Sequence, residues 1–222
     1  AFFFLAAVLA FQRARSEGGA GLAALAGGLS AAAVLCKFSG LVLLPVFLAL
    51  KALDGRKRGP DPWRVALSRW GWGSAGFLGV AYLLYSPALA SGGGLSPLSV
   101  LWGNLMSLVH YEGHPVYFMG HAGRSGHLLY FPVAFLLKPP LLATGVILLG
   151  FCLLATRRLR MEPWFWLPGL LFFLAILPVQ NLGVRYLIPA FPFLFLVGGA
   201  AAGWIWQRAL HSKRILWKWA CL

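Results

Sequence analysis

The sequence predicts an all-α integral membrane protein: a multi-pass helical bundle of about six spans, preceded by one truncated span, with a His-rich outer loop. Three observations support this fold class. Hydrophobic residues make up 60% of the chain and charged residues 11%, whereas about a quarter of the residues in soluble domains are charged. Lys and Arg lie in short blocks between apolar runs, the pattern that orients a membrane protein. The chain also contains 10 Trp and 17 Phe, and aromatic rings favour membrane interfaces.

The net charge of +14 does not indicate nucleic-acid binding, because the basic residues stand in short blocks between apolar runs. Cys36, Cys152 and Cys221 lie far apart and form no CxxC pair. Neither a metal site nor a disulfide framework is therefore indicated. The sequence predicts no cofactor and does not indicate a divalent metal.

The first apolar run, residues 1–11, is shorter than the roughly 20 residues of a span and lacks the basic region of a signal peptide. We interpret it as the end of a span whose beginning is missing, and the chain as a C-terminal fragment. Residues 20–36 and 38–50 are apolar on either side of Lys37. They could form one long helix or a hairpin of two short helices. Only the hairpin places the basic connectors on both sides of it on one face of the membrane.

The connector 51–69 carries six Lys/Arg, and residues 71–90 form the next span. Ala and Gly are frequent in these spans, which would allow close helix contact. The outer region, residues 91–127, opens with a flexible Ser-Gly-Gly-Gly stretch and a proline turn. Within it, residues 99–109 could form an interfacial helix carrying Trp102. A polar segment of this length between spans favours contact with a ligand; a solvated outer loop with incidental histidines is the alternative.

Residues 128–155 are apolar but contain the sequence Lys138-Pro139-Pro140. Proline removes a backbone donor and disfavours helix just before it. We therefore expect one segment at the outer interface, residues 128–137, and a separate span over residues 141–155. A single tilted and kinked helix is the alternative.

Two further spans are predicted, residues 163–177 and 186–206, joined by an outer turn over residues 178–185. In this topology fifteen of the 19 Lys/Arg lie on the inner side, in agreement with the positive-inside rule. We therefore expect one transmembrane domain, residues 1–222, in the cell membrane. Its functional face would be on the extracytoplasmic side.

Four cations lie outside or near the outer interface: Lys37, Arg124, Lys138 and Arg185. Ionisable groups at membrane depth are costly and indicate function. A lipid phosphate or pyrophosphate would be a natural partner, since Arg binds phosphate as a bidentate fork and Lys as a point charge. Alternatively, each side chain snorkels, with its stem on apolar surface and its charge in water. We expect Lys37, Lys138 and Arg185 to converge on such a phosphate. Tyr186 is the amphipathic neighbour of Arg185.

The outer region holds four histidines, and His110 and His114 are four residues apart. An HxxxH spacing alone is a weak indication of zinc, and the neighbouring Gly and Pro disfavour the helix it would need. No metal site is predicted. His114 and Tyr117 could instead hydrogen-bond a sugar or a phosphate. Glu112, the only outer carboxylate, is a weak candidate for a general base; solvation is the alternative reading.

Three stretches on the predicted outer face carry a resemblance to a known family. The first contains HPVYFMG from His114, YFPV from Tyr130 and KPP from Lys138. The second is LCKFSGLVLLP around Lys37, and the third is NLGVRYLIPAFPFL around Arg185. In this order they resemble the polyprenyl-phosphate-dependent membrane glycosyltransferases of the GT-C type, which include the dolichyl-phosphate-mannose protein mannosyltransferases.

The resemblance covers most of the chain and implies an inverting transfer of a sugar from a polyprenyl-phosphate carrier to an acceptor. The implied partners are a membrane lipid, the polyprenyl-phosphate sugar donor, and an acceptor that is a protein, lipid or glycan. In the family the base is an acidic residue of the first outer loop, which has no counterpart here. No catalytic residue is therefore assigned, and we expect the chain to be inactive alone. The substrate-binding residues would be Lys37, His114, Tyr117, Lys138, Arg185 and Tyr186.

Two other function classes fit the composition. A transporter or flippase subunit for a lipid-linked anion would line its route with the same cations. Transporters often show repeats and broken helices at the bilayer middle, but the sequence has no visible repeat and its Lys-containing breaks lie near the outer face. A non-catalytic membrane scaffold would have no use for the outer loop. An acidic outer loop upstream would favour the enzyme.

Overall fold

The computed structural model describes residues 1–58, 62–90, 99, 102–103, 106–107, 116–123, 127–178 and 183–220. The fold is mainly α-helical, as predicted, with one short β-hairpin added. The chain divides into two compact units. Unit 1 comprises residues 1–127 and 178–181, and unit 2 comprises residues 128–177 and 182–222.

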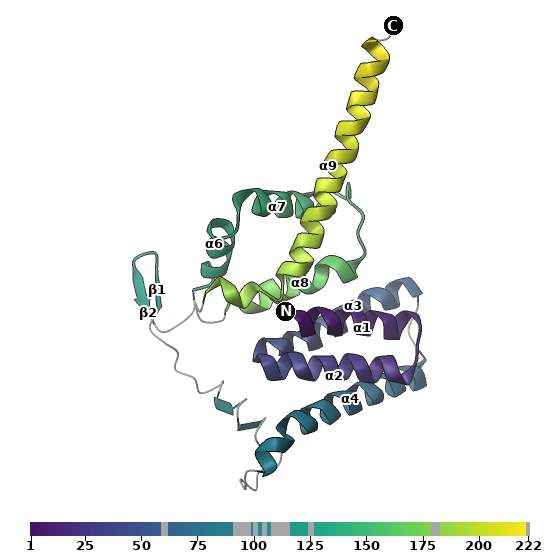
Figure 1. Cartoon of the computed structure of the whole chain (residues 1–222), viewed down its shortest axis with the longest axis vertical. Coiled ribbons are helices and arrows are strands. Elements are labelled where there is room, and N and C mark those ends of the chain that lie inside the picture. Colours follow the sequence, from purple (N-terminus) through teal and green to yellow (C-terminus); the bar gives the residue numbers. More distant parts are fainter. Residues whose placement is uncertain are drawn as a thin grey trace. The chain divides into compact units, whose positions relative to one another are not determined.

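The described part of unit 1 includes four long α-helices that lie lengthwise side by side (Figure 1). They are α1 (Phe2–Ser16), α2 (Ala20–Cys36), α3 (Leu43–Arg58) and α4 (Trp63–Ala90), with the 3-10 helix η1 (Phe38–Val42) before α3. Phe11 stacks on Phe47 with ring centroids 4.2 Å apart, and Arg15 pairs with Asp54. Both contacts follow the same direction along α1 and α3, so these helices are parallel. Because short connections follow α1 and α3, α2 and α4 run the opposite way.

The chain takes the hairpin alternative at Lys37. There α2 ends at Cys36, Lys37 is extended with φ −165° and ψ 127°, and η1 leads into α3. Gly40 approaches α2 so closely that a Cβ at this position would lie 2.7 Å from the carbonyl carbon of Ala33. Only glycine permits this approach, which folds the turn back onto the end of α2.

Small residues bring α2 and α4 together backbone to backbone. A Cβ at Gly27 would collide with the carbonyl oxygen of Gly73, and a Cβ at Gly76 would collide with that of Ala24. These contacts lie on the Ala/Gly-rich stretches that predicted close packing. The prediction of close helix contact is confirmed for this pair.

The region predicted to lie outside, residues 91–127, contains a β-hairpin that was not predicted. β1 (Val116–Phe118) and β2 (His121–Gly123) pair antiparallel. Met119 and Gly120 join them, with φ of 49° and 85°, and a two-residue turn with positive φ at both positions suits the twist of a hairpin. The Val-Tyr-Phe run followed by Met119 and Gly120 was the available signal.

Unit 2 is formed by α6 (Tyr130–Leu137), α7 (Leu141–Ala155), α8 (Pro163–Ile176), the 3-10 helix η2 (Val184–Leu187) and α9 (Phe191–Ala220). Helix α9 packs against both α7 and α8 (Figure 1). Gly150 of α7 lies on Val197, and Gly169 of α8 lies on Phe193, each too close to admit a Cβ without a shift. Val197, Phe193 and Phe172 are buried and form the centre of this core.

Two predicted boundaries have different outcomes. The break at Lys138 separates α6 from α7, so two segments form rather than one kinked helix. The span expected to begin at residue 186 is wrong at its start, because η2 occupies residues 184–187 and α9 begins at Phe191. Pro189 disfavours α-helix at the residue before it. Pro192 fits the first turn of α9, where no backbone donor is required.

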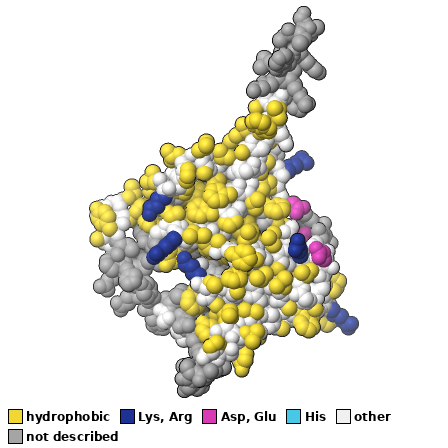
Figure 2. All heavy atoms as spheres, viewed as in Figure 1, with side chains coloured by type: hydrophobic (Ala, Val, Ile, Leu, Met, Phe, Trp, Pro, Cys, Tyr) yellow, Lys and Arg dark blue, Asp and Glu magenta, His cyan; other side chains and the backbone are white. Residues whose placement is uncertain are grey.

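Every predicted span contains helix, but the helices differ in length. Within the described part of the chain, two are long and apolar enough to cross a membrane, Phe38–Gly55 and Phe191–Leu210. The apolar helices Ala20–Cys36, Leu141–Ala155 and Pro163–Ile176 are shorter. Hydrophobic side chains cover much of the face drawn in Figure 2. The multi-pass arrangement in a membrane stays a prediction, as does the interfacial helix at 99–109, which lies largely outside the described residues.

Candidate functional site

The predicted cationic residues are divided between the two units. Lys138 and Arg185 belong to unit 2, whereas Lys37 belongs to unit 1. The convergence of all three therefore stays a prediction. The geometry of unit 2 bears on Lys138 and Arg185, because α6, which ends next to Lys138, packs against η2, which contains Arg185.

Lys138 is held at the end of α6 by the packing of that helix. Its backbone N–H donates to the carbonyl oxygen of Ala134 at 3.0 Å, and its side chain is exposed. Phe131, in the first turn of α6, is fully buried. Phe135, one turn further on the same face, lies 5.6 Å from Phe173 of α8 between ring centroids. Phe131 and Phe135 thus anchor α6 in the core of unit 2, while Lys138 at its end is exposed.

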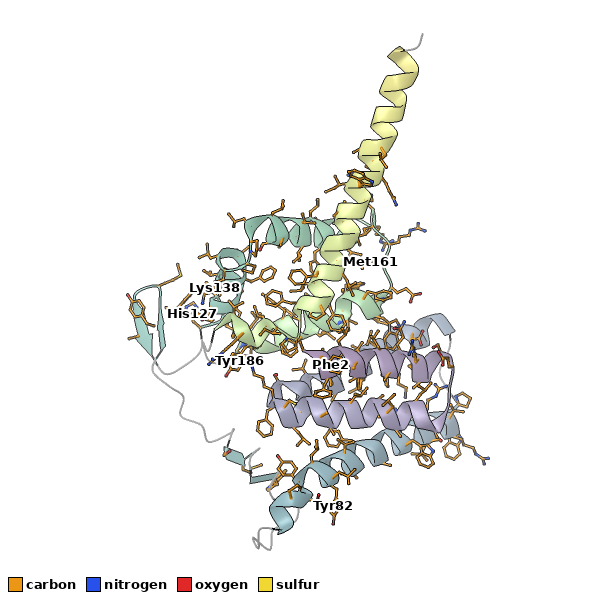
Figure 3. The ribbon with its side chains drawn as sticks, viewed as in Figure 1. Phe2, Tyr82, His127, Lys138, Met161 and Tyr186 are labelled. Atoms are coloured by element: carbon orange, nitrogen blue, oxygen red, sulfur yellow. The ribbon has the colours of Figure 1, made fainter. Side chains whose placement is uncertain are left out.

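Arg185 is positioned by η2. Gly183 precedes η2 with φ 102° and ψ 161°, a conformation that is essentially restricted to glycine. Leu187 is fully buried and anchors the other end of η2. The exposed guanidinium of Arg185 lies 5.7 Å from the centre of the Tyr186 ring, within the range of a cation–π contact. Figure 3 shows Tyr186 and Lys138 in the same part of unit 2.

The charge balance of unit 2 favours an anion at this site. Glu162 is the one acidic residue in the sequence of this unit. It lies before α8, on the connector that follows α7. Lys138 lies before the start of α7, whose 15 residues span about 22 Å at 1.5 Å per residue. Glu162 is therefore at the far end of α7 from Lys138 and does not compensate its charge.

Lys37 of unit 1 has a different setting. It is half-buried in the extended link between α2 and η1. Its carbonyl oxygen accepts the N–H of Gly40 at 2.8 Å, so the backbone of this lysine closes the turn. The residue therefore has a structural role in the hairpin whether or not its ammonium binds a ligand.

Of the predicted ligand-binding residues Tyr117 and His114, the structure describes only Tyr117. Tyr117 lies on β1 and is 73% exposed, so its ring is available to a ligand. Phe118 turns toward His127, with ring centroids 5.0 Å apart. His114, Glu112 and Arg124 lie outside the described residues, and their roles stay predictions.

Sequence reasoning missed the residues that position the cations. Gly183 sets the start of η2, and Phe135 fixes α6. The signals were present, since Gly183 stands two residues before Arg185 and Phe131 and Phe135 have helical spacing. No group of three His, Cys, Asp or Glu that could hold a metal ion occurs in the part of the chain that the structure describes.

Comparisons with known proteins find no matching family model, no matching curated protein and no matching solved structure.

Proposed function

We propose that this chain is part of a membrane glycosyltransferase that moves a sugar from a polyprenyl-phosphate carrier to an acceptor at the extracytoplasmic face. One observation carries the proposal: α6, which ends at Lys138, packs against η2, which contains Arg185. Two cations on neighbouring segments repel each other, and an anion between them offsets that cost. A phosphate on a carrier lipid supplies such an anion.

Lys138 and Arg185 would contribute to the reaction electrostatically. The acceptor oxygen attacks the anomeric carbon of the sugar, and the bond from that carbon to the phosphate oxygen breaks. The electron pair of that bond leaves with the phosphate, and the acceptor proton passes to a base that we do not assign. Lys138 as a point charge and Arg185 as a fork would stabilise the departing phosphate. Tyr186, Tyr117 and His114 would line the sugar or acceptor groove.

Donor binding by the full-length protein tests the proposal. The protein in lipid nanodiscs is titrated with a polyprenyl-phosphate sugar, and sugar transfer is followed separately. Lys138→Ala and Arg185→Ala should each weaken donor binding by about 1.5–3 kcal/mol, the range for a hydrogen bond to a charged group. This corresponds to roughly 10- to 150-fold in Kd. Lys138→Arg should retain more affinity than Lys138→Ala.

Arg158→Ala is the matched control, since Arg158 is an exposed cation of unit 2 on the connector after α7. It should bind the donor like the unaltered protein. If the Lys138, Arg185 and Arg158 variants bind the donor equally well, Lys138 and Arg185 do not form a phosphate site. Movement of the intact lipid across vesicles without sugar transfer would assign the chain to the transporter class instead.

A further inference from the structure

Unit 1 contains a pocket that the proposed sugar-transfer site does not use. Its volume is about 450 Å³, and it lies between α3 and α4, with α1 and α2 behind it. This volume is within the range of small-ligand pockets. The exposed side chains of Leu44 and Leu78 line its edges. The pocket therefore opens sideways to the exterior of the unit.

Most of the pocket wall is apolar along its length. Ala26, Phe77 and Leu41 are among the lining residues. The hydroxyl of Ser30 also lines the pocket, but it donates to the carbonyl oxygen of Ala26 in its own helix at 2.7 Å. The middle of the pocket therefore offers a hydrocarbon surface rather than a polar one.

One end of the pocket is cationic. Arg15, Lys51 and Arg69 line it, from α1, α3 and α4 respectively. The ammonium of Lys51 lies 5.4 Å from the centre of the Trp70 ring, a cation–π contact between α3 and α4 at this end. Asp54 pairs with Arg15 at this end. Among the described residues that line the pocket, none is acidic.

We propose that this pocket binds the acyl chain of an anionic membrane lipid, with the lipid headgroup at Lys51 and Arg69. The inference rests on the membrane topology of the proposed function, in which residues 51–69 face the cytoplasm. The lining of α4 runs from Ala66 to Leu78, about 18 Å at 1.5 Å per residue. One leaflet of bilayer hydrocarbon is about 15 Å thick. The cationic end would therefore lie at the inner surface, where anionic lipids attract basic residues.

A lipid chain fits this pocket better than a helix of a second protein copy. A helix of a second copy would have to present an apolar face to the wall of this pocket. A helix would also have to place an acidic group against the cationic end. One acyl chain of an anionic lipid, with its headgroup at the cationic end, meets both the size and the charge of the site.

Native mass spectrometry of the full chain with two lipids tests the proposal. The probes are phosphatidylglycerol and phosphatidylcholine with identical acyl chains, and inorganic phosphate is the third arm. The unaltered protein should bind phosphatidylglycerol at least tenfold more tightly than phosphatidylcholine. Lys51→Ala/Arg69→Ala should remove that preference. Ser74→Phe, which places a ring in the pocket from α4, should weaken binding of both lipids at least tenfold.

Two controls lie on the same helix. Arg64→Ala removes an exposed cation that does not line the pocket, and Ala75→Phe adds a ring at an exposed position outside it. Both should leave the affinity for phosphatidylglycerol unchanged. A thermal melt of each variant checks that it is folded.

Several results would overturn the inference. They are equal affinity for the two lipids in the unaltered protein, a retained preference in Lys51→Ala/Arg69→Ala, or competition by inorganic phosphate alone. Crosslinking of Ser74→Cys to a second copy in place of lipid would assign the pocket to a protein interface. If the unaltered protein prefers phosphatidylglycerol but does not bind the polyprenyl-phosphate sugar, the proposed function is contradicted and this inference stands. The reverse result would contradict this inference alone.

Discussion

Arg15 and Asp54 form an ion pair between the ends of α1 and α3. The distance from Arg15 Nη2 to Asp54 Oδ2 is 2.9 Å, and Arg15 Nε donates to the same oxygen at 3.0 Å. The two side chains are only 8% and 13% exposed. The pair fixes the register of two parallel helices and shields the guanidinium beside the apolar pocket.

Asp54→Ala should destabilise the protein by about 3 kcal/mol. Removing one member of a buried ion pair leaves the other charge uncompensated, with a typical cost of about 3–5 kcal/mol. The low end applies because both groups retain some exposure. Thermal unfolding in detergent measures the loss. Glu17→Ala removes an exposed carboxylate close to the same end of α1 and should change stability by less than about 0.5 kcal/mol. A similar melt for both variants would show that the pair contributes nothing.

The α2–α4 contact should not tolerate a methyl group. Gly76→Ala places a Cβ against the carbonyl oxygen of Ala24, and overpacking of this kind costs about 1–3 kcal/mol. Gly79→Ala is the matched control on the same helix, since nothing lies within 4 Å of its added Cβ. That control should be neutral or stabilising by up to about 1 kcal/mol, because alanine favours helix. Thermal unfolding of the two variants measures these changes in stability. An unchanged stability of Gly76→Ala would mean that α2 and α4 lie further apart than the structure shows.

Gly183→Ala should weaken the proposed phosphate site without touching either cation. The backbone conformation at Gly183 costs other residues about 1–3 kcal/mol, so η2 would shift and carry Arg185 with it. The affinity of Gly183→Ala for polyprenyl phosphate should therefore fall. Gly145→Ala, a position in α7 where nothing lies within 4 Å of the added Cβ, should leave this affinity unchanged. Isothermal titration of both variants in nanodiscs measures the difference. Full affinity in Gly183→Ala would mean that Arg185 does not depend on η2.

The membrane topology predicts where single cysteines react. In a variant with the native cysteines replaced, Arg64→Cys and Arg158→Cys should be labelled from the cytoplasmic side. Ala122→Cys, on the exposed β2 strand, should be labelled from outside. An impermeant maleimide applied to intact cells and to inverted vesicles makes the comparison. Labelling of Arg64→Cys from outside would break the hairpin topology and move Lys37 to the inner face.

Much of the candidate site could be predicted from the sequence, though its supports could not. Lys138 and Arg185 were predicted because a charge beside a proline or at the start of an apolar run is conspicuous in the sequence. Gly183 and Phe135 were not, because their effect depends on a backbone angle and on aromatic neighbours from other helices. The hairpin at Tyr117 was missed because three-residue strands carry little periodic signal.

The sequence by itself determined that the chain is helical, the bounds of α2, α7 and α8 to within one residue, and the break between α6 and α7 at the Lys-Pro-Pro stretch. These features follow from local rules: apolar runs, proline geometry and the spacing of basic residues. Only the tertiary structure decided that the chain reverses at Lys37 and that Arg15 meets Asp54. It also decided that α6 packs on η2, and that a pocket remains between α3 and α4. Those facts depend on side chains far apart in the sequence, whose contacts form only when the helices pack together.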